Sequence, residues 1–550
     1  MNSTSMLEQM TYEQRYLIHQ AMADLDPQYD ETAQLLVYSS GRHNVRESSH
    51  YLIGLLIRNA PGDVARACDI IERIIDNQYD LPDEIYHGTF KRAPQEPNPP
   101  CGSLPWKSFA PGFAYFLDTT LAQISAELSQ GNKELERRFQ AAVDHVLPTV
   151  WTTYDPNWRE FIACDFAAVL AYFEELLPAE LVRRMEASMV LAVRGSIDRR
   201  RSDAIPMNTN IELMHIFICD FYGHRLNNPA WIEHAHEEAQ RFYESFVEFK
   251  SFAEFNSTTY YSVDLMALGL WRACGKSESI RAIGREVELG LWENIALFYN
   301  AEMANLSGPF TRGYEMEMTE HSMLGVIFFL VLGRGYEHLV VPNVESASDP
   351  LLALVGFQVP EHVKPYLLQH QGDRQVEKQF RELCERSKPG ENTPLCTATA
   401  WIERDVMIGG MAGSLNTSGQ LHPATLYWKT EAGKLYTMRL LRREPGGRWG
   451  AHYRGITYNA KAEKDQLSVQ VQFDTPRELE LFFEISGEQL DSAEITDSFW
   501  RLPGLNLEVE ANAPSPVIVQ RDGGLEIVYP YQPAAGTIGQ MSFILKRVQT

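Results

Sequence analysis

The sequence lacks the motifs of several large enzyme classes. Its seven cysteines are scattered and odd in number, and none forms a Cys-x-x-Cys pair, so neither a disulfide framework nor a zinc ribbon is indicated. The P-loop, the Rossmann glycine fingerprint, His-Glu-x-x-His and Gly-x-Ser-x-Gly are absent as well. His234 and His236 are two positions apart on an expected helix, where their side chains diverge. We therefore expect no bound metal and no cofactor.

Basic charge and long hydrophobic runs are also scarce. A formal net charge of −24 and a pI near 5.1 argue against a nucleic-acid binder, which needs a basic face. The longest strongly apolar run, residues 323–332, is too short to span a bilayer and predicts a buried helix. Residues 1–10 show no basic and apolar signal sequence, which favours a cytoplasmic protein without a membrane partner. A homo-oligomer is left open.

As far as about residue 340, the chain shows helical periodicity. Apolar residues recur at three- and four-residue steps, and Pro or Gly marks the ends of the segments. The clearest expected helices span residues 64–75, 161–176, 178–193, 210–222, 230–249, 261–274 and 277–299. Short loops between about ten to twelve such helices suggest stacked antiparallel pairs. A proline-rich segment at 87–106 interrupts the pattern and is typical of a lid or a binding loop.

After about residue 390 the apolar residues alternate with a period of two. The expected strands span residues 397–408, 424–429, 434–441, 467–473, 479–485, 505–510, 516–520 and 525–529. Such a series of short strands predicts an antiparallel β-sandwich. We therefore expect an α+β multidomain protein: a domain of stacked antiparallel helix pairs at 1–345, a linker at 346–389 with a helix at 373–387, and a β-sandwich at 390–550.

The densest group of polar side chains lies in residues 252–264, at the entrance to an apolar helix. Asn, Ser and Thr favour a helix start, but one cap is enough there. This segment adds a carboxylate, an amide and two adjacent phenols, which are Glu254, Asn256, Tyr260 and Tyr261. That surplus predicts a site. A second polar group, Asn208 with Asn210, precedes it by about fifty residues.

The expected layout is a helical domain followed by a β-sandwich. Within it, one helix carries Asn208 and Asn210, and a later helix carries Tyr260 and Tyr261. This arrangement resembles that of the polysaccharide lyases of the heparinase II/III-like and alginate lyase type. In place of that family's Asn-His dipeptide the chain has Asn210-Ile211, and the nearest histidine is His215. The resemblance implies that the N-terminal domain at 1–345 is an α/α toroid (an incomplete α/α barrel). It also implies a lyase that cleaves a uronic-acid-containing oligo- or polysaccharide by β-elimination.

A lyase of this kind removes a proton next to a carboxylate, and hydrogen-bond donors such as Asn and Arg neutralise the charge that builds up. On this hypothesis Asn210, together with Asn208 or Asn256, binds the carboxylate, a tyrosine transfers protons, and a histidine is the partner base. The candidate catalytic residues are Tyr260, Tyr261, Asn210, His215 and His321. The candidate substrate-binding residues are Asn208, Glu254, Asn256, Arg312, Tyr314, Asp155, Asn157, Trp158, Glu160 and His87.

Several of these residues also have an ordinary structural explanation. Asn208 can simply cap the following helix. Tyr260 and Tyr261 point to different sides of a helix, so at most one is expected in the site, while the other packs with its hydroxyl satisfied. His215 follows apolar residues on an apolar helix and is typical of a core histidine. Arg312, in a Gly-bounded turn, either binds an anion or belongs to a surface turn.

A glycoside hydrolase is the main alternative activity. It needs two carboxylates across the scissile bond. The available carboxylates are Asp155, Glu160, Glu254, Asp264 and Glu315, and nothing in the sequence pairs any two of them. Asp155 favours a turn, whereas Trp158 can stack on a sugar. A small-metabolite enzyme and a non-catalytic carbohydrate-binding protein are further alternatives, since a fold does not dictate a function.

Overall fold

The chain forms two compact units. The computed structural model describes residues 6–82, 86–98, 104–105, 150–151, 155–201, 208–342, 349–382, 393–416, 419–451, 453, 455–534 and 537–548. The helical unit takes its residues from Met1–Glu244, Ser262–Glu288 and Thr319–Gln358, and the sheet unit takes its residues from Ser245–Tyr261, Leu289–Met318 and Val359–Thr550. The units alternate along the chain, so no single position divides them. The domain limits at 345 and 390 stay a prediction.

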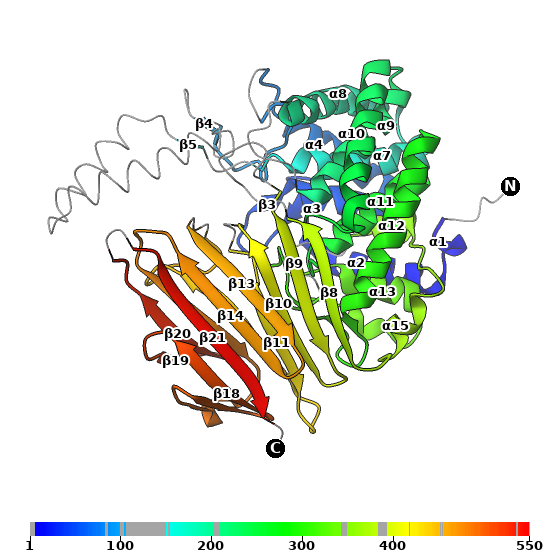
Figure 1. Ribbon diagram of the computed structural model, residues 1–550. Helices are drawn as coiled ribbons and strands as arrows, with labels where there is room; N and C mark the ends of the chain where they lie inside the picture. The colour runs from blue at the N-terminus through cyan, green and yellow to red at the C-terminus, as the bar shows by residue number, and fades with distance from the viewer. Residues whose placement is uncertain are drawn as a thin grey trace. The chain divides into compact units, whose positions relative to one another are not determined.

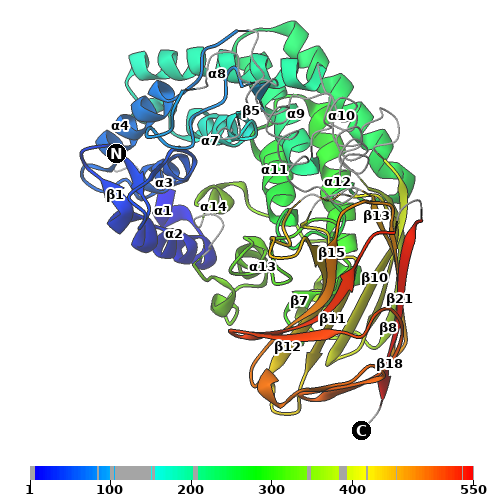
Figure 2. The same ribbon diagram turned by 90° about the vertical axis from the view of Figure 1, so that its left-hand side faces the viewer.

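The helical unit is built from helices that pack on their neighbours in sequence and space (Figure 1). The helices are α1 Met6–Gln9, α2 Tyr12–Leu25, α3 Val45–Arg58, α4 Asp63–Asp76, α7 Trp158–Tyr172, α8 Ala179–Arg201, α9 Thr209–Arg225, α10 Pro229–Phe249, α11 Tyr261–Cys274, α12 Glu278–Phe298, α13 Leu324–Leu332 and α14 Leu351–Val355; α10 and α12 continue into the sheet unit. Helix α3 packs against α2, α4 and α7, and α8 packs against α4, α7 and α9. In Figure 2 the helices of this unit follow an arc from α2 and α3 through α7 and α8 to α9, α10 and α11.

Short strands complete the helical unit. They are β1 Tyr29–Asp30, β2 Leu35–Val37 and β3 His43–Asn44, which form one small antiparallel sheet, and β4 Leu104–Pro105 and β5 Val150–Trp151, which form a parallel pair. Local signals set the helix ends: Thr11 and Gln14 form a capping box at α2, and Asn59 ends α3 in the left-handed region with φ of 48°.

The predicted helices are confirmed in position. Those expected at 64–75, 210–222, 230–249 and 261–274 correspond to α4, α9, α10 and α11 within a few residues. The apolar run at 323–332 forms the buried helix α13. Within the described residues, no helix combines the length and the apolar character that a membrane span requires.

The sheet unit contains one large antiparallel sheet (Figure 1). Its strands are β8 Arg374–Arg381, β9 Leu395–Ile402, β10 Val406–Ser414, β11 Ala424–Lys429, β12 Leu435–Arg443, β13 Ile456–Glu463, β14 Gln466–Phe473, β15 Leu479–Ser486, β16 Glu494–Ile495, β17 Phe499–Leu502, β18 Leu505–Asn512, β19 Val517–Arg521, β20 Gly524–Tyr531 and β21 Gly539–Val548. The order is β16-β17-β18-β21-β14-β13-β10-β11-β12-β15-β20-β19, with β9 and then β8 branching from β10. The short strands β6 Tyr299–Asn300 and β7 Asn305–Leu306 pair separately, and helix α15 spans Lys364–Leu368.

The large sheet folds over on itself, as the end-on view in Figure 2 shows. Phe483 on β15 contacts Phe543 on β21 edge to face, with ring centroids 5.3 Å apart, and Tyr529 on β20 contacts the same ring at 4.8 Å. Strands β15 and β21 are far apart in the hydrogen-bonded order, so these contacts require two layers to face each other across an aromatic core. The prediction of an antiparallel β region is confirmed.

Two local predictions in this region are wrong. The helix expected at 373–387 is strand β8 over Arg374–Arg381, paired with β9. Its buried residues, Val376 and Phe380, are four positions apart, a spacing that fits one face of a strand as well as one face of a helix. The single strand expected at 397–408 is the hairpin β9–β10, because a tight turn is closed by the hydrogen bond from Glu403 N to Val406 O (2.8 Å).

Candidate functional site

The side-chain and backbone amides of Asn256 hold the polar segment at 252–264 in place. Asn256 adopts the left-handed conformation with φ of 51°, which Asn tolerates better than most residues. Its Nδ2 donates to the carbonyl oxygens of Ser307 (2.7 Å) and Pro309 (2.8 Å), and its backbone N–H donates to the Tyr261 hydroxyl (2.6 Å). Part of the polar surplus therefore fastens this segment to the loop that precedes Arg312.

The two adjacent tyrosines lie in different surroundings. Tyr261 is fully buried, with its ring edge-on to Phe252 at 6.2 Å and its hydroxyl engaged by Asn256. Tyr260 is only partly buried, and its hydroxyl faces Arg312 and Tyr314. The expected divergence of the pair is thus observed.

Arg312 is the centre of a group of polar side chains in the sheet unit. Its guanidinium carbon lies 4.1 Å from the centre of the Tyr260 ring, and Nη2 donates to the Tyr260 hydroxyl at 3.0 Å. Nη1 forms an ion pair with Glu254, and Nε donates to Gln420 Oε1 at 3.0 Å. The Tyr260 hydroxyl in turn donates to the Tyr314 hydroxyl at 3.3 Å. We call Glu254, Tyr260, Arg312, Tyr314 and Gln420 the Arg312 cluster.

Backbone contacts place the turn that carries Arg312. The Ser257 hydroxyl donates to the carbonyl oxygen of Arg312 at 2.6 Å, and the Tyr314 N–H donates to Thr259 Oγ1 at 3.1 Å. Hydroxyls of the polar segment therefore align the turn residue by residue. This explains why a helix entrance carries more polar side chains than one cap requires.

Electrostatics in the Arg312 cluster favour a neutral phenol beside a cation. Burial raises the pKa of Tyr260 well above its ordinary value, and the charge of Arg312 opposes only part of that rise. Burial by itself lowers the pKa of Arg312, but Tyr260 and Glu254 outweigh it and raise the value further. Tyr260 is consequently protonated at neutral pH and can donate a proton.

His422 and Arg439 lie beside the Arg312 cluster and were missed in the sequence. His422 is fully buried; its Nε2–H donates to the carbonyl oxygen of Gly313 at 2.9 Å, and burial lowers its pKa. Arg439 pairs with Glu315 (2.7 Å) and lies 4.7 Å from the centre of the Trp449 ring. An arginine and a histidine within or next to apolar strands are the signal that could have identified them.

The helical unit holds the two asparagines predicted to bind a carboxylate. Asn208 is the N-cap residue of α9, where its carbonyl oxygen accepts from Glu212 N at 2.9 Å while its side chain makes no capping hydrogen bond. Asn210 is buried in the first turn of α9. The roles of both asparagines stay predictions.

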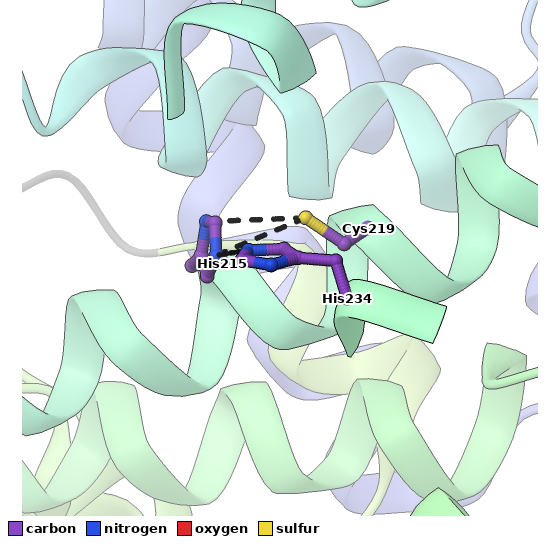
Figure 3. Close-up of side chains that lie close together, drawn as sticks. All are labelled: His215, Cys219 and His234. Atoms are coloured by element: carbon purple, nitrogen blue, oxygen red, sulfur yellow. Dashed lines mark hydrogen bonds between the residues drawn. The ribbon is translucent and has the colours of Figure 1, made fainter. Parts of the chain in front are cut away.

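His215 belongs to a buried polar chain in the same unit. Its Nδ1 lies 2.7 Å from the Ser196 hydroxyl, which also contacts Glu160 Oε1 at 2.6 Å. Its Nε2 lies 2.9 Å from Nε2 of His234, and the Cys219 sulfur lies 3.9 Å from both ring nitrogens (Figure 3). Burial lowers the pKa of His215, so this ring is neutral. The structure therefore joins two predicted site residues, Glu160 and His215, through a serine.

The segment before α7 forms a turn, as its sequence predicts. Asp155 Oδ1 accepts from the backbone N–H of Asn157 at 2.9 Å, and Asn157 Oδ1 accepts from Arg199 Nη1 at 2.9 Å. The Trp158 ring is 7% exposed and lies 5.3 Å from the guanidinium of Arg46. A sugar-stacking role for Trp158 stays a prediction.

His87 is joined through its backbone to the polar chain of His215, because Arg159 contacts both the His87 carbonyl oxygen and Glu160 Oε1 (3.5 Å). The carbonyl oxygen of His87 accepts from Arg159 Nη1 at 2.6 Å, and its Nδ1 accepts from Leu81 N at 3.1 Å. Gly195 permits this approach, because a Cβ there would lie 2.0 Å from the His87 oxygen. His321 is half-buried in the turn before α13. Residues 99–103 and 106 of the expected lid lie outside the described residues.

A second buried cluster of charged residues was not expected. His50 on α3 lies 3.4 Å from Glu47, 3.7 Å from Asp165 and 4.0 Å from Asp349, and Ser49 donates to Asp165. Burial alone lowers the pKa of His50, but the three carboxylates outweigh it and raise the value to about 10. Burial raises the pKa of Asp165. The cluster is therefore an imidazolium enclosed by acids.

The sequence of the chain matches the model of one protein family. The family model described as "Domain of unknown function (DUF8769)" matches residues 15–147 and 140–353. The chain belongs to this family. The DUF8769 match includes the His215 and His50 clusters together with Tyr260 and Arg312, and it ends before Gln420 and His422. No curated protein is significantly similar to the chain in sequence.

Solved structures similar to this DUF8769 protein carry titles of heparin and heparan sulfate lyases. One is "Heparinase III-BT4657 gene product", with 8% identity, a TM-score of 0.34, and coverage of 98% of this chain and 85% of the other. Another is heparan sulfate lyase HepC from Pedobacter heparinus, with 8% identity, a TM-score of 0.29, and coverage of 90% and 91%.

Proposed function

We propose that the chain is a lyase that cleaves a uronic-acid-containing oligosaccharide by β-elimination. We also propose that its helices form an incomplete α/α toroid and that its folded sheet forms a β-sandwich. The observation that most supports the activity is the Tyr260 hydroxyl, which lies between the Arg312 guanidinium and the Tyr314 hydroxyl. A phenol beside a fixed cation suits proton transfer next to a carboxylate.

Arg312 is suited to bind the substrate carboxylate. Its contacts to Glu254, Tyr260 and Gln420 use Nη1, Nη2 and Nε, and each Nη nitrogen carries a second N–H. Those groups can form charge-assisted hydrogen bonds to an anion, which strengthen as charge moves onto the carboxylate during the reaction. A local cation also offsets the repulsion of an anionic substrate by the acidic chain, whose net charge is −24.

The tyrosine pair supplies both proton transfers. In the active form one proton is shared by Tyr260 and Tyr314, and Arg312 stabilises the phenolate. The C5–H bond of the uronate breaks and its proton goes to the phenolate oxygen, while the bonding electrons form the C4–C5 double bond. The C4–O bond breaks, and the leaving oxygen takes the proton of the other hydroxyl. A proton then passes across the 3.3 Å hydrogen bond and restores the pair.

Hydrolysis fits the Arg312 cluster less well. A glycoside hydrolase needs one carboxylic acid that donates a proton to the leaving oxygen and a second carboxylate across the bond. Glu254 is 1% exposed and accepts from Arg312, and Glu315 is paired with Arg439 at 2.7 Å. Both carboxylates therefore act as acceptors for arginine, whereas the Tyr260 hydroxyl has a proton to donate.

The proposed activity predicts an ultraviolet-absorbing product. Incubation of the protein with acidic oligosaccharides should produce the absorbance of a C4–C5 unsaturated uronate, with one new reducing end for each chromophore. A neutral oligosaccharide of the same length is the control, because without a carboxylate its C5 proton is not acidic, and it should remain intact. New reducing ends without the chromophore would indicate a hydrolase, and no cleavage of any acidic oligosaccharide would contradict the proposal.

The rate of elimination should rise with pH. The active form has lost one proton from the tyrosine pair, and burial places the pKa of Tyr260 well above its ordinary value of about 10. The phenolate fraction thus grows about tenfold for each pH unit through neutral and mildly alkaline pH. The measurement is kcat/KM against pH, on a substrate whose own ionisation is complete. A maximum at acidic pH would exclude the phenolate mechanism.

A further inference from the structure

Three side chains that bind metals come together in the core of the helical unit. His215 and Cys219 are four residues apart on α9, which places them on the same helix face, and His234 reaches them from α10 (Figure 3). All three are buried, and one donor atom from each lies within 4.8 Å of the other two. Two imidazoles and a thiol are a donor set that zinc prefers.

The Glu160–Ser196 pair fixes the orientation of the His215 ring. Ser196 has a single O–H, and it donates this hydrogen to Glu160 Oε1 at 2.6 Å. The 2.7 Å contact between Ser196 Oγ and His215 Nδ1 must then be donated by the ring, so the proton of His215 is on Nδ1. The lone pair on Nε2 points toward His234. A carboxylate that acts through a hydroxyl on the distal nitrogen is the support that metal-binding histidines commonly have.

We propose that His215 Nε2, His234 Nε2 and Cys219 Sγ bind a zinc ion. Tetrahedral zinc with bonds of about 2.0–2.1 Å to nitrogen and 2.3 Å to sulfur requires ligand atoms roughly 3.3–3.6 Å apart. The observed separations are 2.9 Å between the two nitrogens and 3.9 Å from the sulfur to each nitrogen of the His215 ring, and the donor atoms all lie within 4.8 Å of one another. Because the sulfur is equally far from both ring nitrogens, zinc binding requires the Cys219 side chain to turn toward Nε2 of His215, and a water molecule can take the fourth position.

A hydrogen bond between the two histidines is the alternative explanation of this geometry. In that case Nε2 of His234 carries a proton and donates it to His215, and the thiol is a weak additional contact. Zinc replaces that proton and converts Cys219 to a thiolate, because both groups bind a metal only when deprotonated. The two explanations therefore differ in proton release, in metal content and in the state of the sulfur. Neither depends on the proposed lyase activity.

The test uses the full-length protein, stripped with a chelator and then titrated with zinc. We expect one equivalent to bind, protons to be released, and the thermal unfolding midpoint to rise. X-ray absorption at the zinc edge should show one sulfur and two imidazole nitrogens in the first coordination shell. With cobalt in place of zinc, the wild-type protein should show a thiolate-to-metal charge-transfer band, which requires no variant.

Variants assign the ligands. Cys219→Ser should lose the charge-transfer band, whereas Cys164→Ser, the same change at another buried cysteine of this unit, should keep it. Ser196→Ala should weaken zinc binding by about 10–100-fold without removing a ligand, because Ser196 only positions the His215 ring. Failure of the wild-type protein to bind zinc would overturn the proposal, and so would a bound metal whose spectrum lacks sulfur.

Discussion

Replacing Tyr260 by phenylalanine is expected to lower kcat/KM by about 10²–10⁴-fold, the usual contribution of a positioned acid or base. The substitution removes the hydroxyl that accepts from Arg312 and donates to Tyr314, but it leaves the ring on which the guanidinium lies. The free energy of unfolding should change by no more than about 0.5–1.5 kcal/mol, the net contribution of a typical hydrogen bond, because Tyr260 is not a fully buried residue. Initial rates of product absorbance and a denaturant titration measure the two effects.

Tyr261→Phe is the matched control, since it removes the same atom from the next residue. Here the hydroxyl is buried and accepts from the backbone N–H of Asn256, so its loss should cost about 1–3 kcal/mol of stability. Its kcat/KM should stay within a few-fold of the wild type. One variant thus loses activity and the other loses stability. Full activity in both variants would refute the assignment of Tyr260.

Replacing His50 by glutamine should destabilise the protein by about 3–5 kcal/mol, the cost of breaking a buried ion pair from one side. His50 is the cation that Glu47, Asp165 and Asp349 share, and all four side chains are buried. Glutamine keeps a polar group of similar size but cannot carry the charge. The measurement is the free energy of unfolding at pH 6, where the imidazolium is fully present.

The contribution of His50 should disappear at high pH. Its pKa is raised from 6.5 in the unfolded chain to about 10 in the folded one, so the folded protein binds the proton more tightly. The stabilisation is complete below pH 6.5 and is lost as the pH rises through 10. Wild-type stability should therefore fall over this range, and the gap between wild type and His50→Gln should narrow. A wild-type stability that stays level from pH 6.5 to 10 would contradict the assignment.

His362→Gln provides the control for this pH range. His362 lies 3.0 Å from Glu293, but its side chain is 62% exposed, and exposed pairs contribute only about 0–1 kcal/mol. The same substitution at this position should leave stability almost unchanged. A comparable loss in both variants would mean that histidine replacement itself, rather than the buried charge, destabilises the protein.

Sequence periodicity predicted which segments form helices and strands better than it predicted the residues at which some of them begin and end. Helix α11 begins and ends where expected, and strand β11 does too, because each has a clear apolar pattern and a turn at both ends. Strand β8 was missed because Val376 and Phe380 are spaced for either structure, and only pairing with β9 decides between them. That pairing is a long-range contact, which a local window of sequence does not contain.

The candidate site was predicted in part for the same reason. The surplus of polar residues identified Glu254 and Tyr260, and the Gly-bounded turn identified Arg312 and Tyr314, but their mutual contacts became visible only in the fold. Gln420 comes from a loop after β10, and nothing near it in sequence suggests a partner. His50 was detectable, because it follows Glu47 on a helix whose next residues are all apolar.

The alternation of the two units along the chain also determines the order in which their residues leave the ribosome during synthesis. Tyr260 and Arg312 emerge well before Gln420, so the Arg312 cluster remains without its last member until the loop after β10 has been synthesised. At roughly 5–20 residues per second this delay lasts for seconds. A fragment that begins at Val359 would contain every strand of the large sheet and neither Tyr260 nor Arg312. The sheet therefore cannot be transferred to another protein as a module that carries the site with it.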